Sequence, residues 1–287
     1  MVFSPTSSVN ERLCWIVEQE FLEMLMDKAW PALEREDLVC GNTAKWVLRA
    51  SNGVTQRANS VWPAAPADSE GSSVAAVGLE AAAGIEGSVR AASQWYRRRR
   101  LPLIFQVFDD PRNAALNGVL DRQRFTRQSE TRIMVRGVED VPLGASTVEI
   151  LDLPSAEWLR LWWSVDGRGG DAELSVAHKI LTACPALYAM VRNDDGVPAA
   201  VGRLALVDGW GGIYSMATSA PHRRRGYGTE VLAALLSAGA ERNLKGFWLL
   251  VTAANHGAQS LYSQAGFTDS GSYLYRQAPL KRAPGGC

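Results

Sequence analysis

The stretch PHRRRGYGTEVLAALLSAG, residues 221–239, places an arginine cluster directly before an apolar helical pattern. Arg223, Arg224 and Arg225 are followed by Gly226 and Gly228. Unpaired N–H groups and the helix dipole make a helix N-terminus attractive to anions. Glycine lets a ligand approach the backbone, and guanidinium groups are suited to phosphate. The stretch therefore favours an anion site, although RRRGYG alone is explained equally well by a glycine-containing turn with solvated arginines.

The segments around this stretch alternate between strand and helix patterns. The strand GGIYSMATSA, residues 211–220, leads into it, and a helix over 228–242 follows. The strand GFWLLVTAA, the helix HGAQSLYSQAGF and the strand SGSYLYRQ complete the C-terminal part. Upstream lie the strand TVEIL, two helices over 154–167 and 173–183, and two strands joined at Asp195-Gly196. This order predicts an α/β chain of the α+β type with a mixed sheet.

Two motifs together resemble the GNAT superfamily of acyl-CoA N-acyltransferases. The phosphate loop of that family reads Arg/Gln-x-x-Gly-x-Gly/Ala between a strand and a helix, and residues 223–228 fit it. The second motif is SLYSQAGF, residues 260–267, which follows Asn255 at the end of a strand. The resemblance covers about residues 146–278. It implies a GNAT fold in the C-terminal half and acetyl-CoA as a cosubstrate.

The resemblance also assigns roles to individual residues. Backbone amides from Arg224 to Thr229 would bind the CoA pyrophosphate, and strand 211–218 would splay from strand 246–253 to admit pantetheine. An amide near Met216 or Ala217 would polarise the thioester carbonyl. Asn255 would contact the cofactor arm or a water, and the Tyr262 hydroxyl would protonate the leaving thiolate, unless Tyr262 is simply a core residue. The expected catalytic residues are Tyr262 and Asn255, and the expected cofactor-binding residues are Met216, Ala217, Thr218, Arg223, Arg224, Arg225, Gly226, Tyr227, Gly228, Thr229, Asn255 and Tyr262.

A general base is the missing element of this pattern. Many family members carry a glutamate on or near the strand before the loop, but GGIYSMAT contains none. Asp208, Tyr214 and a water relay are the alternatives, and the relay is favoured; His222 is expected to cap or face solvent, and His256 to open a helix. The sequence thus favours transfer of an acetyl group to a primary amine by direct attack in a ternary complex. The rival hypothesis is a non-catalytic acyl-CoA sensor on the same fold.

The first half repeats the rhythm of strands and helices without the phosphate loop. LNGVLDRQRF, residues 116–125, echoes the second motif, with Arg124 where glycine would stand. We expect a helix over 10–35, two strands around Asn52-Gly53 and a loose connection over 63–88. This half is interpreted as a degenerate GNAT-like domain, with an unrelated α+β domain as the alternative.

Three parts of the chain follow from this interpretation. Residues 1–140 form the degenerate N-terminal domain, 146–278 form the catalytic domain, and 279–287 form a flexible tail. The boundary lies in the polar, turn-rich segment GVEDVPLGAS, residues 137–146.

Composition limits the other function classes. Lysine plus arginine and aspartate plus glutamate number 30 each, so the chain has no net charge and a global nucleic-acid footprint is not expected. The run Arg97–Arg100 is better explained as a solvated helix C-terminus. The 4 cysteines form no CxxC pair and the 3 histidines have no metal-ligand spacing, so no metal site is expected. Neither a signal peptide nor a membrane span is expected, and the scattered cysteines favour a cytoplasmic location.

The expected partner is a small-molecule or peptide amine acceptor, without nucleic acid or membrane. The sequence leaves room for a homodimer. Trp158, Trp162 and Trp163 lie at helical spacing where the family's acceptor site is bordered, so they are candidates for an aromatic wall. Core packing is the default for at least one of them.

Overall fold

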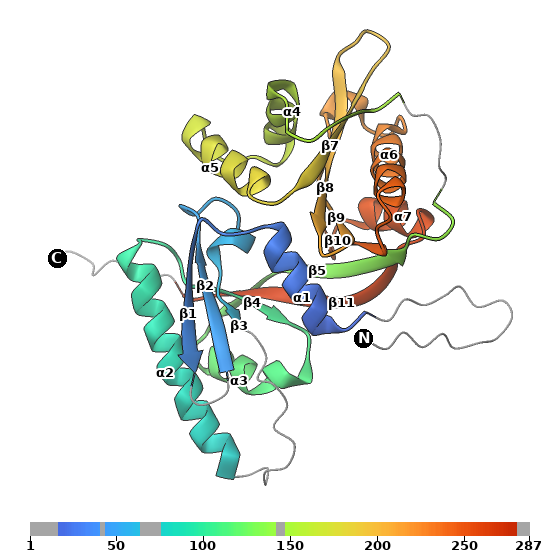
Figure 1. Ribbon diagram of the computed structural model, residues 1–287. Coiled ribbons are helices and arrows are strands. Elements are labelled where there is room, and N and C mark those ends of the chain that lie inside the picture. Colours follow the sequence, from blue (N-terminus) through green and yellow to red (C-terminus); the bar gives the residue numbers. More distant parts are fainter. Residues whose placement is uncertain (1–16, 41–43, 64–75, 142–146, 280–287) are drawn as a thin grey trace, which may run out of the picture. The chain divides into compact units, whose positions relative to one another are not determined.

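The structure is a computed structural model that describes residues 17–40, 44–63, 76–141 and 147–279 (Figure 1). The chain forms two compact units. Unit 1 comprises residues 1–31 and 132–271, and unit 2 comprises residues 32–131 and 272–287. The strands β5 (Thr126–Gly137) and β11 (Thr268–Gln277) cross the division, so each contributes residues to both units.

Unit 1 is built on a mixed sheet whose strands follow the order β11-β5-β10-β9-β8-β7-β6. Strands β7 to β9 pair in antiparallel fashion, as do β6 and β7, whereas β10 runs parallel to β9. The α/β class with a mixed sheet is therefore confirmed. The remaining strands of this unit are β6 (Glu149–Leu151), β7 (Ala186–Arg192), β8 (Pro198–Val207), β9 (Trp210–Thr218) and β10 (Gly246–Thr252).

Helices cover both faces of this sheet because successive strand residues point in opposite directions. A Cβ atom on Gly202 of β8 would collide with Val231 and Leu235 of α6, so α6 packs closely on that face. Its neighbour Arg203 points the other way and donates to the carbonyl oxygens of Ala29 in α1 (3.1 Å) and Leu181 in α5 (3.0 Å). The helices of unit 1 are α1 (Gln19–Ala29), α4 (Ala156–Asp166), α5 (Asp171–Thr182), α6 (Tyr227–Glu241) and α7 (His256–Gln264).

The face of β8 that carries Arg203 is lined with aromatic side chains. Arg203 is fully buried between its cross-strand neighbours Tyr188 and Tyr214. Trp30 stacks on Tyr214 with ring centroids 5.6 Å apart, and the Arg203 guanidinium lies 5.8 Å from the Trp30 ring. Cation–π contacts of this kind compensate a buried arginine for part of its lost hydration.

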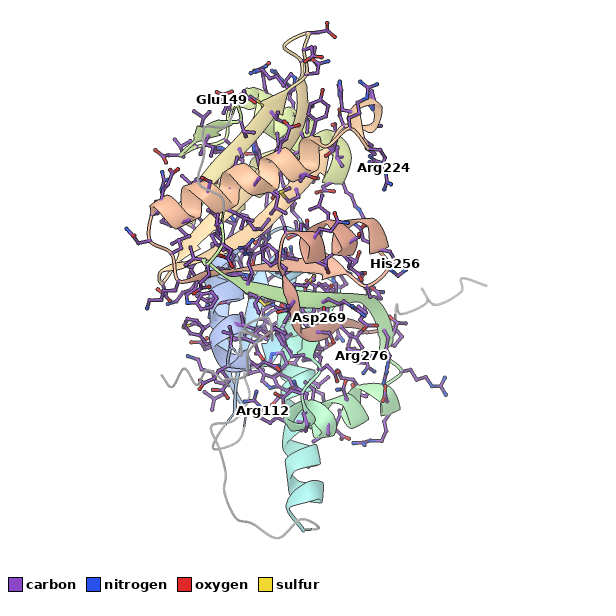
Figure 2. All side chains as sticks on the ribbon, turned by 90° about the vertical axis from the view of Figure 1, so that its right-hand side faces the viewer. Arg112, Glu149, Arg224, His256, Asp269 and Arg276 are labelled. Carbon is purple, nitrogen blue, oxygen red and sulfur yellow. The ribbon has the colours of Figure 1, made fainter. Side chains whose placement is uncertain are left out.

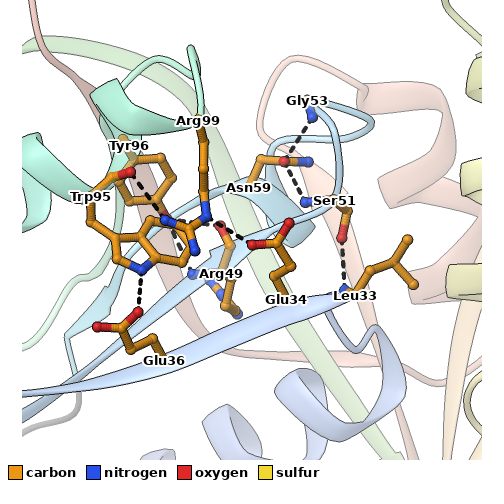
Figure 3. A network of polar contacts seen from close by, with 10 residues as sticks. All are labelled: Leu33, Glu34, Glu36, Arg49, Ser51, Gly53, Asn59, Trp95, Tyr96 and Arg99. Carbon is orange, nitrogen blue, oxygen red and sulfur yellow. Dashed lines mark hydrogen bonds and ion pairs between the residues drawn. The ribbon is translucent and has the colours of Figure 1, made fainter.

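Unit 2 contains an antiparallel sheet in the order β1-β2-β3 and the pair β4–β11. Figure 3 shows a polar network of unit 2 that includes the buried residue Arg49. The Tyr96 hydroxyl donates to the Arg49 carbonyl oxygen at 2.9 Å. The Arg49 side chain donates to the Ser60 hydroxyl and to Gln106 (2.7 Å). The elements of unit 2 are β1 (Glu34–Cys40), β2 (Ala44–Ala50), β3 (Trp62–Pro63), α2 (Ala76–Arg98), β4 (Ile104–Phe108) and α3 (Ala114–Arg122).

Several N-terminal expectations need correction. The predicted helix over 10–35 is observed only as α1, and residues 34–35 already belong to β1; residues 10–16 lie outside the described residues. Asn52 and Gly53 do form a turn with positive φ of 51° and 78°, but β2 pairs extensively with β1 and only briefly with β3. The two expected strands are present as β2 and β3 and pair in antiparallel fashion. A 3-10 turn over Arg57–Asn59 also lies between them, so Asn52-Gly53 does not by itself connect the two strands. Alternating apolar residues in β1 are too few to mark it as a strand.

The connection expected over 63–88 is also shorter than predicted. Helix α2 already starts at Ala76, because its alanine-rich beginning suits a helix as well as a loop. Residues 64–75, the boundary residues 142–146 and the tail from 280 onward lie outside the described residues. The domain limits at 140 and 146 stay a prediction. The compact units divide at 31/32, 131/132 and 271/272.

Candidate functional site

Strands β9 and β10 separate along their length. Their pairing joins Gly211–Ile213 to Phe247–Leu249, and no pairing follows in the described parts of the two strands. β9 also bulges against β8 between Val201 and Arg203, where Ser215 has a positive φ of 53°. A bulge bends a strand and re-aims its backbone. The splay expected between these strands is therefore present, and Met216, Ala217 and Thr218 lie on the separated end of β9.

The arginine-glycine loop connects this separated end to α6. Arg224 and Gly226 both adopt left-handed backbone conformations, with φ of 64° and 91°. Gly226 is the N-cap of α6 and has no side chain to satisfy the first amides of the helix. Among the described residues, no hydrogen-bond acceptor is found for the N–H groups of residues 224–228. Several donors therefore remain available to an anion at this helix end.

The side chains of the loop add positive charge to these donors. Arg223, Arg224 and Arg225 are exposed and form no ion pair with a described residue. Figure 2 shows Arg224 beyond the N-terminal end of α6, on the same side as His256 at the start of α7. Thr229 is exposed in the first turn, and Tyr227 is half-buried. A Cβ on Gly228 would lie 3.5 Å from the Thr218 hydroxyl, an ordinary contact distance, so the start of α6 lies beside the end of β9.

His222 anchors the beginning of the loop. The side-chain oxygen Oδ1 of Asn193 accepts hydrogen bonds from the amides of Asp195 (3.1 Å) and Val197 (2.8 Å). This fixes the orientation of the Asn193 side-chain amide, so Asn193 Nδ2 donates to His222 Nε2 at 3.2 Å. His222 Nδ1 then donates to the Ser219 hydroxyl at 2.7 Å. His222 thus ties the β7–β8 turn to the loop, a role more specific than the cap or solvent-facing residue expected. His256 is exposed at the first position of α7, as expected.

Helix α7 brings the second motif to the same end of the sheet. The Asn255 side chain caps α7 by accepting the Ala258 amide at 3.1 Å, which leaves its side-chain nitrogen free among the described residues. The Tyr262 ring is 8% exposed and packs edge-on against Phe267. Burial, and next the charge of Asp166, raise the pKa of Tyr262 to about 12. The phenol therefore stays protonated, and no described residue hydrogen-bonds its hydroxyl.

Asp166 is an exposed acid of unit 1 that the sequence analysis does not single out. It is the last residue of α4, which packs on β8 and β9. The side chain reaches solvent, yet desolvation raises the pKa of its carboxyl above the ordinary value, opposed by a hydrogen bond from Trp162 and the charge of Arg223.

The bases considered from the sequence are placed less favourably. Asp208 lies in the β8–β9 turn, at the end of β9 remote from the loop, and pairs with Lys28 at 2.7 Å. The Tyr214 hydroxyl is buried and accepts a hydrogen bond from Trp248 Nε1 at 3.1 Å. Neither group is available at the separated end of β9.

The tryptophans of α4 divide into core and surface. Trp158 is buried and donates to the carbonyl oxygens of Ala189 (3.0 Å) and Gly202 (3.2 Å), which makes it a packing residue. Trp162 is also buried, and only Trp163 is partly exposed. Of the three rings, only that of Trp163 is exposed enough to line an acceptor site.

A sequence model for the family described as "Probable histone acetyltransferase Rv0428c C-terminal" matches residues 19–276. That match covers most of the chain, including both motifs. The chain belongs to this family. As a GNAT acetyltransferase it is 24% identical over 263 residues to an uncharacterized N-acetyltransferase, YobR, of Bacillus subtilis, covering 89% of this chain and 96% of the relative.

Solved structures support the same fold. A GCN5-related N-acetyltransferase from Kribbella flavida superposes with a TM-score of 0.62 at 18% identity, covering 91% of this chain and 93% of the other. A tandem GNAT protein from the clavulanic acid biosynthesis pathway gives 0.59 at 12% identity, covering 91% and 89%. At these identities the likeness establishes the GNAT fold.

None of the helices in the described ranges has both the length and the apolar character that crossing a membrane requires. Within the same ranges, no group of three or more His, Cys, Asp or Glu side chains could hold a metal ion. The individual cofactor contacts of the GNAT site stay predictions.

Proposed function

We propose that this GNAT protein transfers an acetyl group from acetyl-CoA to a primary amine by direct attack in a ternary complex. The observation that carries the proposal is the α6 N-terminus, where unpaired amides and exposed arginines adjoin the separated ends of β9 and β10. Amides of residues 224–228 would hold the pyrophosphate, and the gap between the strands would hold pantetheine.

The chemistry follows from the residues near that gap. The acceptor nitrogen attacks the thioester carbonyl carbon, and the C–S bond breaks as the amide bond forms. A backbone N–H group on the separated end of β9, near Met216 or Ala217, would donate to the developing oxyanion. Tyr262 holds its proton at neutral pH and would pass it to the leaving thiolate. Asn255 would position the cofactor arm through its free side-chain nitrogen.

The acceptor belongs to one of two amine classes, small amines or lysine side chains of peptides. The description of the family model as a probable histone acetyltransferase supports including lysine peptides in any substrate panel. Both classes present the same reacting group, a primary amine that is protonated in free solution at neutral pH.

A thiol-release assay tests the proposal. Wild-type protein is incubated with acetyl-CoA and a panel of small amines, polyamines and lysine peptides, and free CoA thiol is followed over time. We expect amine-dependent release for at least one acceptor and none for Gly226→Glu. Tight acetyl-CoA binding without release for the whole panel would instead favour the rival, a non-catalytic sensor, which the lack of a glutamate on β9 supports.

A further inference from the structure

His222 contacts both ends of the arginine-glycine loop. At the start of the loop, its Nδ1 lies 2.7 Å from the hydroxyl of Ser219, which directly follows β9. At the far end, its ring packs edge-on against Tyr227 in the first turn of α6, with ring centroids 5.8 Å apart. Asn193 of the β7–β8 turn contacts the imidazole at Nε2, at 3.2 Å. One side chain therefore joins the three segments that border the loop.

The loop between these contacts depends on its ends for its shape. Arg224 and Gly226 are left-handed, and the amides of residues 224–228 donate to no acceptor in the part of the chain that the structure describes. Internal hydrogen bonds of the loop backbone therefore do not hold its amides in place. A site that is already held in its bound shape loses less entropy when the ligand binds. Contacts that fix the two ends of the loop should accordingly contribute to anion affinity.

Hydrogen bonds to Asn193 determine which nitrogen of His222 carries the proton. Asn193 Oδ1 accepts the amides of Asp195 and Val197, so the NH2 group of this side chain faces the imidazole. The same Nδ2 also donates to the Asp195 carboxylate at 3.4 Å. A donor facing Nε2 requires a lone pair on that nitrogen, so the proton of the neutral ring lies on Nδ1 and is donated to Ser219. The contacts thus select one of the two neutral forms of the imidazole.

Protonation of the ring is incompatible with this arrangement. An imidazolium carries a hydrogen on both nitrogens, so Nε2–H would face the NH2 group of Asn193, a donor against a donor. The other titratable or charged side chains of the β7–β8 turn, the loop and the first turn of α6 are Asp194, Asp195, Arg223, Arg224, Arg225, Tyr227 and Glu230. The charged ones are exposed and of both signs, so water and salt screen them. The two direct hydrogen bonds of the ring therefore decide the outcome.

We infer that neutral His222 is a positioning residue for the anion site, and that its protonation releases the loop and weakens CoA binding. The inference rests on the proposed binding of the CoA pyrophosphate to this loop. The neutral ring ties the loop to the β7–β8 turn, whereas the imidazolium keeps only the bond to Ser219. The charge gained does not compensate, because three exposed arginines already supply positive charge. CoA affinity should fall as the pH falls through the range in which histidine ordinarily titrates, about pH 6.5.

Nitrogen NMR of the imidazole rings tests the proton positions directly. The chain has 3 histidines, so the His222 signals can be assigned by comparison with His222→Gln. At about pH 8, above the ordinary titration of histidine, the wild-type ring should carry its proton on Nδ1. Asn193→Asp keeps an oxygen for the turn amides and replaces the facing donor by an acceptor, so the proton should move to Nε2. A wild-type proton on Nε2 would overturn the inference.

Calorimetry with CoA at about pH 8 and about pH 5.5 tests the consequence for binding. His222→Gln offers Asn193 an acceptor that cannot be protonated, so its pH dependence reports the CoA phosphates, whose titration is common to all variants. Acidification should weaken the wild type by about 5-fold or more beyond the change in His222→Gln. His178→Gln, which removes an exposed histidine of α5, should behave like the wild type.

Two more variants complete the series. Asn193→Asp accepts a hydrogen bond from the imidazolium, so its pH dependence should match that of His222→Gln. His222→Phe keeps a ring beside Tyr227 but loses both hydrogen bonds, so it should bind CoA about 10-fold more weakly than the wild type at about pH 8.

The outcomes separate this inference from the proposed function. Equal pH dependence in the wild type and His222→Gln, or tighter binding by the wild type at acidic pH, would refute the role of His222 and leave CoA binding at the loop standing. Full affinity in His222→Phe would refute it as well. Absence of CoA binding by the wild type would overturn both.

Discussion

Helices α3 and α7 end in the same way in two different units, but only one of them carries reactive groups. Phe125 donates its amide to the Leu120 carbonyl at 3.0 Å, and Phe267 donates to the Tyr262 carbonyl at 3.0 Å. The residue before each phenylalanine is left-handed, Arg124 with φ 59° and Gly266 with φ 87°. Each helix is followed at once by a long strand, β5 or β11.

The side chains at matched positions tell the two helices apart. Leu120 is completely buried where α7 has Tyr262 with an unpartnered hydroxyl. Asn113 is buried and donates to the Phe108 carbonyl at 3.0 Å, whereas its counterpart Asn255 is exposed and caps α7. The two units therefore share the backbone geometry of the helix end but not its polar side chains. This is expected when function resides in particular side chains and not in the fold.

The turns that precede α3 and α6 differ in the same sense. Both contain a proline in a short 3-10 turn, Pro111–Asn113 and Ala220–His222. The Asp110 carboxylate accepts the Arg112 amide at 2.8 Å and pairs with the Arg112 guanidinium, so unit 2 satisfies this turn with its own acid. In unit 1 the donors after the turn are left open, which is the condition for binding an external anion.

The largest expected effect would come from filling the open turn. Gly226→Glu adds a negative charge and a side chain at φ 91°, so CoA affinity should fall by about 10²-fold or more. Gly209→Glu is the matched control, with φ 78° in the β8–β9 turn. Calorimetry on the wild type should give one CoA per chain. A stoichiometry of two would break the comparison, because unit 2 would then hold a site of its own.

Removing the Tyr262 hydroxyl should leave α7, like α3, without a proton donor at this position. Tyr262→Phe deletes one hydroxyl and little volume, so kcat should fall by about 10²-fold while acetyl-CoA affinity changes little. A thiolate with a pKa of about 8.5 leaves fairly well unaided. A decrease of only a few-fold would therefore assign Tyr262 a positioning role, and full activity at every pH would return it to the core.

Exchanging the left-handed residues tests the shared frame. Arg124→Gly should stabilise the protein by about 1 kcal/mol because a left-handed conformation costs arginine but not glycine. Gly266→Ala should destabilise it by about 1 kcal/mol for the same reason. Urea denaturation of both variants measures these changes. Effects of equal sign at the two positions would show that the helix ends are not equivalent.

The smallest expected effect is on stability and concerns Asp110, whose carboxylate accepts the Arg112 amide in the turn of unit 2. Hydrogen bonds from Arg112 hold the pKa of Asp110 below its ordinary value. Its stabilisation is therefore present above a pH of about 4 and lost as the pH falls through the lower folded-state value. Asp110→Asn should cost about 1 kcal/mol at pH 7 and less toward pH 2. A constant cost over this range would exclude the ionised carboxylate as the cause.

The sequence predicted the C-terminal elements well because their periodicity is local. The arginine-glycine loop, the strand before it and Asn255 before α7 all lie where the patterns put them, and the GNAT assignment is confirmed by the family match. The hydrogen bonds that His222 makes to Asn193 and Ser219 could not be predicted, because Asn193 is distant in sequence and only folding brings it near.

Long-range strand pairing was the other feature that periodicity could not supply. The segment SETRIMVRG has the pattern of a strand, but nothing in it indicates that β5 lies between β10 and β11. Likewise, β1 was not anticipated as the main partner of β2. Alternation of apolar residues indicates which face is buried and leaves the neighbouring strand undetermined.

The place of β5 in the sheet of unit 1 has a consequence for how the chain is made. On the ribosome, Ile133, Met134 and Val135 emerge long before β10 and β11, between which they are finally buried. This apolar strand therefore lacks both of its neighbouring strands until translation is nearly complete. A gene fragment starting at residue 146 would lack it and would leave the facing edges of β10 and β11 open to pair with other chains. Split-gene and fusion versions of this protein should accordingly keep residues 126–137 with the C-terminal fragment.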